Sequence, residues 1–277
     1  VMARLGLAAF PVATQTYPRK QDWLVLNALA GLAGSLHKLM LDLRILQSPA
    51  VGEWAEPFRE KQVGSSAMPF ERNPITAEKV DSLAGWIAAL PRVAWDNAAL
   101  AVLERTLDDS ANRRVTLAEA FLAADEIVEA SAGVLRDLRL FPDVIARTLA
   151  TFGAFAAIAR VLLALVSAGA DRQEMHERLR RHSLAAWAEM SRTGRNPLCE
   201  MMGQDEAITR YIGVASIGEL MDATPHVRDA PEWGGRLAHM IGARLEQRGR
   251  SAGAGLSTPL PAPETVLELV WRVSLDN

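Results

Sequence analysis

The run from Gln21 to Leu46, QDWLVLNALAGLAGSLHKLMLDLRIL, sets the expected fold. Its apolar side chains alternate at spacings of four and three residues, and this heptad seam consists of Val25, Leu29, Leu32, Leu36, Leu39, Leu43 and Leu46. Such spacing is typical of a helix that packs lengthwise against partner helices. A second stripe adds Trp23, Leu26, Ala30, Ala33 and Met40. The broad apolar face predicts neighbours on two sides of a helix about 39 Å long.

The residues after this run also favour helices over strands. A helix is expected from Pro74, and Pro91 should kink or end it. A polar break at 104–114 precedes two further long helices, expected at about 117–138 and 142–167.

A boundary is expected near position 168. Gly169 suits the C-cap of one helix, and Asp171 suits the N-cap of the next. We therefore expect an all-α fold of the long-helix bundle type in residues 1–168. A smaller helical domain should occupy 169–277, with a linker rich in Gly, Ala and Pro at about 251–263.

Composition excludes several classes of protein. Apolar residues make up 49% of the 277 residues, which is ample for a core, and the net charge of −3 gives no reason to expect a nucleic acid partner. The single Cys199 rules out an internal disulfide framework and fits a reducing, cytoplasmic compartment. The longest uncharged apolar run, Val161 to Ala170, is too short for a membrane span. The chain starts at Val1 without a signal-peptide layout, so we expect that a preceding segment is missing.

The loop Gly64 to Pro74, GSSAMPFERNP, is the most informative segment for function. Asn73 followed by Pro74 is a strong helix start, with Asn as the N-cap. The adjacent hydroxyls of Ser65 and Ser66 are therefore carried next to a helix N-terminus, where anions are favoured.

Two more polar segments stand out. Thr14 to Asp22, TQTYPRKQD, precedes the long helix. Glu104 to Arg114, ERTLDDSANRR, contains three arginines and a serine that could hold a phosphate, since a guanidinium group matches the geometry of an oxyanion. A salt-bridged polar connection is the alternative interpretation. The five histidines are scattered, so no metal site is expected; they are His37, His176, His182, His226 and His239.

Together the three segments resemble the adenylosuccinate lyase family of the fumarase/aspartase superfamily. The loop 64–74 is similar to the superfamily signature, and the Arg/Ser segment 104–114 narrows the resemblance to this family. The resemblance extends from about Val1 to Asp229. It implies the cleavage of adenylosuccinate to AMP and fumarate by β-elimination, and of the related succinylated carboxamide intermediate of purine biosynthesis.

The family resemblance also implies roles for individual residues. Ser66 would be the general base, Ser65 would help to bind fumarate, and Glu78 would orient the site. The substrate-binding positions would be Thr14, Gln15, Met68, Glu71 and Asn73, and the nucleotide phosphate would be held by Arg105, Ser110 and Arg114. No metal or organic cofactor is implied. The partners would be a nucleotide substrate and further copies of the chain in a homotetramer with shared active sites.

One position departs from the family pattern, because Glu71 stands where the family has a lysine. Replacing a cation near a dicarboxylate substrate by an anion should lower the rate by several orders of magnitude. In addition, none of the five histidines matches the family's general acid, which lies N-terminal to the matched part. Two alternatives therefore stay open. One is a non-catalytic helical scaffold, and the other is a different superfamily member such as 3-carboxymuconate cycloisomerase.

Overall fold

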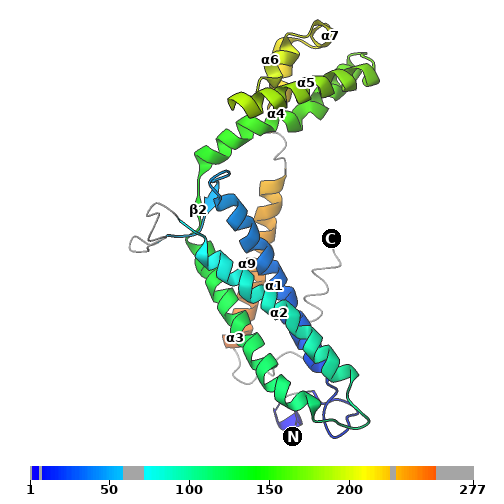
Figure 1. The fold of residues 1–277 in the computed structure, drawn as a ribbon, viewed down its shortest axis with the longest axis vertical. Coiled ribbons are helices and arrows are strands. Elements are labelled where there is room, and N and C mark those ends of the chain that lie inside the picture. The colour runs from blue at the N-terminus through cyan, green and yellow to red at the C-terminus, as the bar shows by residue number, and fades with distance from the viewer. Residues whose placement is uncertain (1, 6–7, 59–71, 225–228, 254–277) are drawn as a thin grey trace. The chain divides into compact units, whose positions relative to one another are not determined.

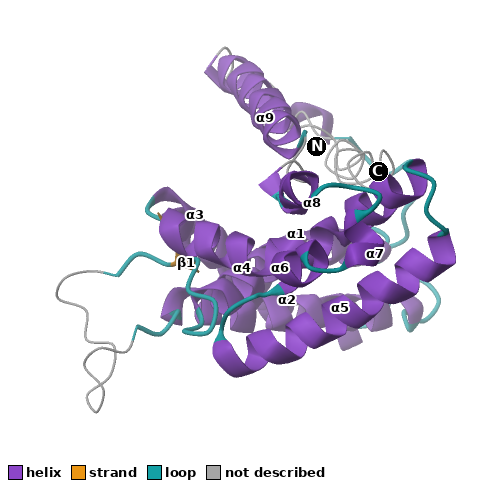
Figure 2. Ribbon diagram, turned by 90° about the horizontal axis from the view of Figure 1, so that it is seen from above, coloured by secondary structure: helices purple, strands orange, loops and turns teal. Residues whose placement is uncertain are grey.

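The computed structural model describes residues 2–5, 8–58, 72–224 and 229–253, with side chains up to 247. Two compact units divide the chain: Val1–Phe141 with Gly255–Asn277 form one, and Pro142–Ala254 form the other. Helices make up most of the described chain, and strand is confined to two short segments (Figure 2). The expected all-α fold is confirmed.

Three long helices form the first unit. Helices α1 (Lys20–Gln47), α2 (Ile75–Ala99) and α3 (Asp108–Arg136) lie side by side along their length (Figure 1). A short 3-10 helix, η1 (Met2–Leu5), precedes them, and strands β1 (Trp54–Ala55) and β2 (Arg139–Leu140) pair antiparallel. The main core of this unit is made of Ala33, Met40, Leu43, Ala77, Val80, Ala84, Ile87, Ala123, Ala124, Ile127 and Val134.

The packing of α1 corrects the predicted role of its heptad seam. Leu26, Ala33 and Met40, which belong to the second stripe, are fully buried in the bundle. Of the seam itself only Leu43 is fully buried, and Leu32 is 42% exposed. The bundle of one chain therefore covers the second stripe and leaves most of the seam partly open.

Two helix limits differ from those expected. Pro91 was expected to kink or end its helix, and it lies inside α2, which continues to Ala99, so this proline does not end the helix. Helix α3 begins at Asp108, within the stretch predicted to be a polar break. Asp108 and Asp109 lie in its first turn, where acidic side chains interact favourably with the helix dipole.

The second unit contains the remaining helices of the described chain. They are α4 (Pro142–Ser167), α5 (Arg172–Thr193), α6 (Leu198–Gly203), α7 (Glu206–Thr209), α8 (Val214–Met221) and α9 (Ala230–Gly253). The predicted caps between α4 and α5 are confirmed: Gly169 has a φ of +91°, and the Asp171 carboxylate accepts the Glu174 N–H at 2.8 Å. Helix α4 packs on α5 and α8, so the compact units divide after Phe141, earlier than the domain boundary predicted at 168.

Two helices, α1 and α4, are long and apolar enough to cross a membrane by length and composition. Their mean hydropathies over an 18-residue window are 1.4 and 2.2. Val161 to Ala170, the longest run without a charge, is too short to span a membrane, whereas a window that tolerates a few charges selects both helices. Core helices of bundles share this composition, and α1 packs against α2 and α3 in the structure.

Candidate active site

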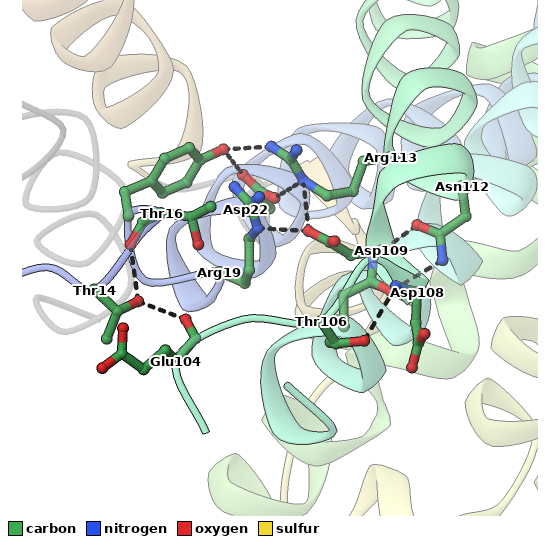
Figure 3. A network of polar contacts seen from close by, with 12 residues as sticks. Thr14, Thr16, Arg19, Asp22, Glu104, Thr106, Asp108, Asp109, Asn112 and Arg113 are labelled. Atoms are coloured by element: carbon green, nitrogen blue, oxygen red, sulfur yellow. Dashed lines mark hydrogen bonds and ion pairs between the residues drawn. The ribbon is translucent and has the colours of Figure 1, made fainter. Parts of the chain in front are cut away.

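The two polar segments 14–22 and 104–114 meet at one end of the bundle in the first unit (Figure 3). The Thr14 hydroxyl donates a hydrogen bond to the backbone carbonyl of Glu104 at 2.8 Å. The segments are 90 residues apart in sequence, and the pairing of α1 with α3 brings their N-terminal ends together. The prediction treated them as two parts of one site, and the structure places them in contact.

A buried ionic network joins the two helix ends (Figure 3). Arg113 Nε lies 2.5 Å from Asp22 Oδ2, and Arg19 Nε lies 2.5 Å from Asp109 Oδ2. Tyr17 donates its hydroxyl hydrogen to Asp22 Oδ1 at 2.6 Å and accepts a hydrogen bond from Arg113. Asp22 and Asp109 are only 4% and 2% exposed, so their charges depend on these arginines.

The network also shifts the pKa values of its members. Burial raises the pKa of the Tyr17 hydroxyl, and its hydrogen bond to the Asp22 carboxylate raises it further. The hydrogen bond to Asp22 likewise raises the pKa of Arg113, against the smaller effect of burial. Tyr17 therefore stays protonated and Arg113 stays charged, and the two side chains form a structural hydrogen-bonded pair.

A cavity of about 210 Å³ adjoins this network. Three basic residues, Arg19, Lys20 and Arg105, and two acidic residues, Glu104 and Asp109, line it. Close by, the side-chain amides of Asn97 and Asn112 bond each other at 2.7 and 2.9 Å, which joins α2 to α3. The cavity is therefore polar, with more cationic than anionic side chains on its wall.

The structure distinguishes the arginines of the Arg/Ser segment. Arg113 is committed to Asp22, whereas Arg105 and Arg114 are exposed and make no ion pair with any described residue. Ser110 and Arg114 are one turn apart on the same face of α3. We call Arg105, Ser110 and Arg114 the phosphate clamp. Gln15 is exposed beside it and makes no contact with the described residues.

The other end of the bundle carries the ends of the signature loop. Ser65, Ser66, Met68 and Glu71 lie outside the described residues. Asn73 is described, but it does not cap α2 with its side chain, so the predicted N-cap was wrong.

The N-terminus of α2 is capped by a more distant residue. The buried carboxylate of Glu56 accepts the N–H groups of Thr76 at 3.2 Å and of Ala77 at 3.1 Å. The carbonyls of Asn73 and Pro74 accept the N–H groups of Ile75 and Glu78. An anion was expected at this helix N-terminus, and in the structure the chain supplies its own.

Glu78 lies in the first turn of α2, at the same end as the loop. Its side chain is half exposed, and its Oε1 lies 3.8 Å from Arg44 Nη2 of α1. Arg44 also donates to the buried Asp81 at 2.9 Å, which fixes the guanidinium group between the two acids. The Glu78 carboxylate therefore has a defined orientation and remains accessible to solvent.

Sequence reasoning missed four residues that organise these two ends: Asp22, Gln47, Glu56 and Arg113. Asp22 offered a signal, because a carboxylate in a predicted apolar face needs a buried partner. Among the described residues, no group of three or more His, Cys, Asp or Glu side chains is placed to hold a metal ion.

Family models match two parts of the chain. A model described as adenylosuccinate lyase C-terminus matches residues 155–237, and one described as lyase matches residues 2–88. Together they account for more than half of the chain.

Characterised relatives agree with these matches. Adenylosuccinate lyase from Schistosoma mansoni is 42% identical over 196 residues, which is 70% of this chain and 40% of the relative. The Saccharomyces cerevisiae enzyme is 40% identical over 198 residues, which is 71% of this chain and 41% of the relative. The chain thus spans less than half the length of these two relatives.

Solved structures support the fold. The 3-carboxy-cis,cis-muconate lactonizing enzyme from Pseudomonas putida has a TM-score of 0.67 at 22% identity, covering 83% of this chain and 49% of that one. A fumarate lyase from Mesorhizobium has a TM-score of 0.63 at 21% identity, covering 77% and 45%. With the helical bundle and the two matched family models, these findings show that the chain belongs to the adenylosuccinate lyase family of the fumarase/aspartase superfamily.

Proposed function

We propose that the protein to which this chain belongs cleaves adenylosuccinate to AMP and fumarate. The observation that carries the proposal is the state of the arginines at the N-terminal end of α3. Arg113 is neutralised by Asp22, while Arg105 and Arg114 are exposed and form no ion pair with any residue that the structure describes. Arg105 lines the polar cavity, and exposed guanidinium groups suit a phosphate, which accepts paired hydrogen bonds from arginine.

The reaction assigned to the site is a β-elimination. A proton leaves the carbon next to a carboxylate, the C–N bond breaks, and the electron pair of the C–H bond forms the double bond of fumarate. Ser66 would take the proton, and Ser65 would bind a fumarate carboxylate. A serine hydroxyl is a weak base and needs activation by its surroundings. Glu78 would contribute as an orienting carboxylate, and the general acid would come from a segment outside this chain.

The geometry favours an active site shared between copies of the chain. Asp22, beside the clamp, and Gln47, beside the loop, are 25 residues apart on α1, a rise of about 38 Å. Ser66 is six residues from Arg72, and a fully extended chain spans at most about 22 Å over that length. A loop of this length does not span the distance to the clamp of the same chain, which supports a site in which the loop of one copy meets the clamp of another.

The surface of α1 is consistent with such an assembly. Leu41 and Ile45, one turn apart on this helix, are 40% and 56% exposed, and Leu32 is 42% exposed on its opposite side. Exposed apolar side chains on a long helix are consistent with an interface. We propose a homotetramer in the cytoplasm, with active sites built from more than one subunit and a nucleotide as the small-molecule partner.

Binding of AMP tests the nucleotide assignment without requiring catalysis. Titration calorimetry with the wild-type chain should show binding that Arg114→Ala weakens by 10-fold or more, because a charge-assisted hydrogen bond is lost. Arg92→Ala is the matched control, since Arg92 is an exposed arginine of α2 whose partner is Asp96. Equal affinity of wild type and Arg114→Ala would remove the nucleotide assignment and favour the cycloisomerase alternative.

A non-catalytic scaffold is the second candidate, and Glu71 is the feature that favours it. A carboxylate in place of the family's lysine repels a dicarboxylate substrate. The two candidates differ in one assay: release of fumarate from adenylosuccinate by full-length protein carrying Glu71→Lys. Fumarate at the level of the blank would support the scaffold.

A further inference from the structure

Gln47 and Glu56 lie where the segment that carries Ser65 and Ser66 leaves and rejoins the bundle. Gln47 is the last residue of α1, and Glu56 directly follows β1. Neither residue has a role in the proposed chemistry, and neither makes an ion pair with another described residue. Their contacts nevertheless connect four separate backbone segments.

The side-chain amide of Gln47 bridges the two ends of this segment. Its Oε1 accepts the backbone N–H of Glu56 at 2.8 Å, and its Nε2 donates to the backbone carbonyl of Arg72 at 2.8 Å. The guanidinium group of Arg72 lies over the ring of Phe58 at 5.1 Å, which is a second contact between the same two ends. The first and last described residues of the segment are thus held next to each other.

The Glu56 side chain attaches these two adjacent ends of the segment to α2. It is 3% exposed, and among the described residues its two oxygens accept the N–H groups of Thr76 and Ala77. A buried carboxylate is costly unless it is well hydrogen-bonded, and the N-terminus of a helix offers both free donors and a favourable dipole. Among the described residues no other acceptor serves these two donors, so the carboxylate and the helix end depend on each other.

We infer that Gln47 and Glu56 are positioning residues that together form an anchor, hereafter the loop anchor, fixing both ends of the segment 57–72 to the N-terminus of α2. Glu78, in the same first turn, is thereby held in a constant relation to the two described ends of that segment, at Phe58 and at Arg72. The effect on turnover rests on the proposed function, whereas the effect on α2 does not. The phosphate clamp is at the other end of α1, so the loop anchor should act on catalysis and leave nucleotide binding unchanged.

Hydrogen exchange tests the structural part directly. In the full chain, Glu56→Ala should speed amide exchange in a peptide covering 73–80 by 10-fold or more, and Glu56→Gln by less, because Gln keeps one acceptor. Peptides from the middle of α3 should be unaffected. Glu126→Gln is the matched control, because Glu126 is a half-exposed carboxylate at the same end that pairs with Lys79. Unchanged exchange at 73–80 in Glu56→Ala would overturn the inference.

Kinetics test the functional part. In a background with measurable fumarate release, Gln47→Leu and Glu56→Ala should lower kcat by 10-fold or more with AMP affinity within about twofold of wild type, and Glu56→Gln should partly restore kcat. A parallel loss of AMP affinity would indicate general unfolding and would overturn the assignment as positioning residues. Faster exchange at 73–80 in a protein that releases no fumarate in any background would leave the loop anchor standing and remove the proposed reaction.

Discussion

The two ends of the helical bundle in the first unit stabilise their buried carboxylates in different ways. At the clamp end, charged side chains pair with one another, and the arginines in excess of the acids remain at the surface. At the loop end, a single buried carboxylate is satisfied entirely by backbone N–H groups. The clamp end thus keeps positive charge available for a ligand, and the loop end uses its negative charge to fix the chain. The proposed shared site would take one end from each of two copies.

The largest effect is expected from Glu71→Lys. At about 4 Å and an effective dielectric constant near 20, one charge pair is worth about 4 kcal/mol, and reversing the sign removes a repulsion as well. Fumarate release should rise by about a thousand-fold after allowance for screening. Glu119→Lys makes the same charge change at an exposed position of α3 and should not raise the rate. Equal rates for the two variants would mean that Glu71 does not face the substrate.

The next largest effect tests whether the two ends of different copies combine. In the Glu71→Lys background, Ser66→Ala and Arg114→Ala should each be close to inactive. When the two variants are refolded together in equal amounts, each contribution to a shared site is intact with a probability of one half. About a quarter of the activity should therefore return, as expected for sites between symmetric copies. Failure to recover any activity would place both residues in the same chain's site.

A smaller effect is expected from the ionic network at the clamp end. Arg113→Ala should lower the free energy of unfolding by about 3 kcal/mol, because it leaves the buried carboxylate of Asp22 without its partner. Chemical denaturation measures this loss. Arg92→Ala breaks an exposed ion pair and should leave stability unchanged. If both variants were equally stable, the network would not hold α1 and α3 together.

The smallest effect concerns Asp205, an acidic residue of the second unit that belongs to neither end of the bundle in the first unit. Burial opposes its ionisation, but hydrogen bonds from His182 and Arg178 hold its pKa below the usual value. The lowered pKa contributes stability above the pKa of the unfolded chain, near 4, and the contribution is lost as pH falls through the folded value. Asp205→Asn keeps the N-cap acceptor and should cost about 1 kcal/mol at pH 7.

The pH dependence is the decisive part of the Asp205 measurement. Denaturation curves of wild type and Asp205→Asn should differ most above pH 5 and converge as the pH falls below the lowered pKa of folded Asp205, where the wild-type carboxylate is neutral in both states. A difference that stays constant from pH 7 to pH 3 would show that the cost comes from packing rather than charge.

The sequence predicted where most of the long helices lie along the chain, but it did not predict how they pack against one another. The long helices and the caps at Gly169 and Asp171 followed from periodicity and local capping chemistry, which act between neighbours in sequence. The Asn73 cap failed because Glu56, which is 20 residues from Thr76, competes for the same N–H groups. Of the two outcomes expected at Pro91, a kink or an end, the end does not occur, because packing against α1 and α3 outweighs one lost hydrogen bond.

The sequence by itself determined the fold class, the family and the set of polar residues available for chemistry, because spacing and residue type carry that information. Only the tertiary structure decided which of two adjacent arginines pairs inward and which faces solvent. Arg113 and Arg114 differ by about 100° of rotation around α3, and that rotation is set by the packing of α3 on α1. The same packing places residues 104–114 and the N-terminus of α2 at opposite ends of α1, because helix α1 rises about 38 Å between Asp22 and Gln47.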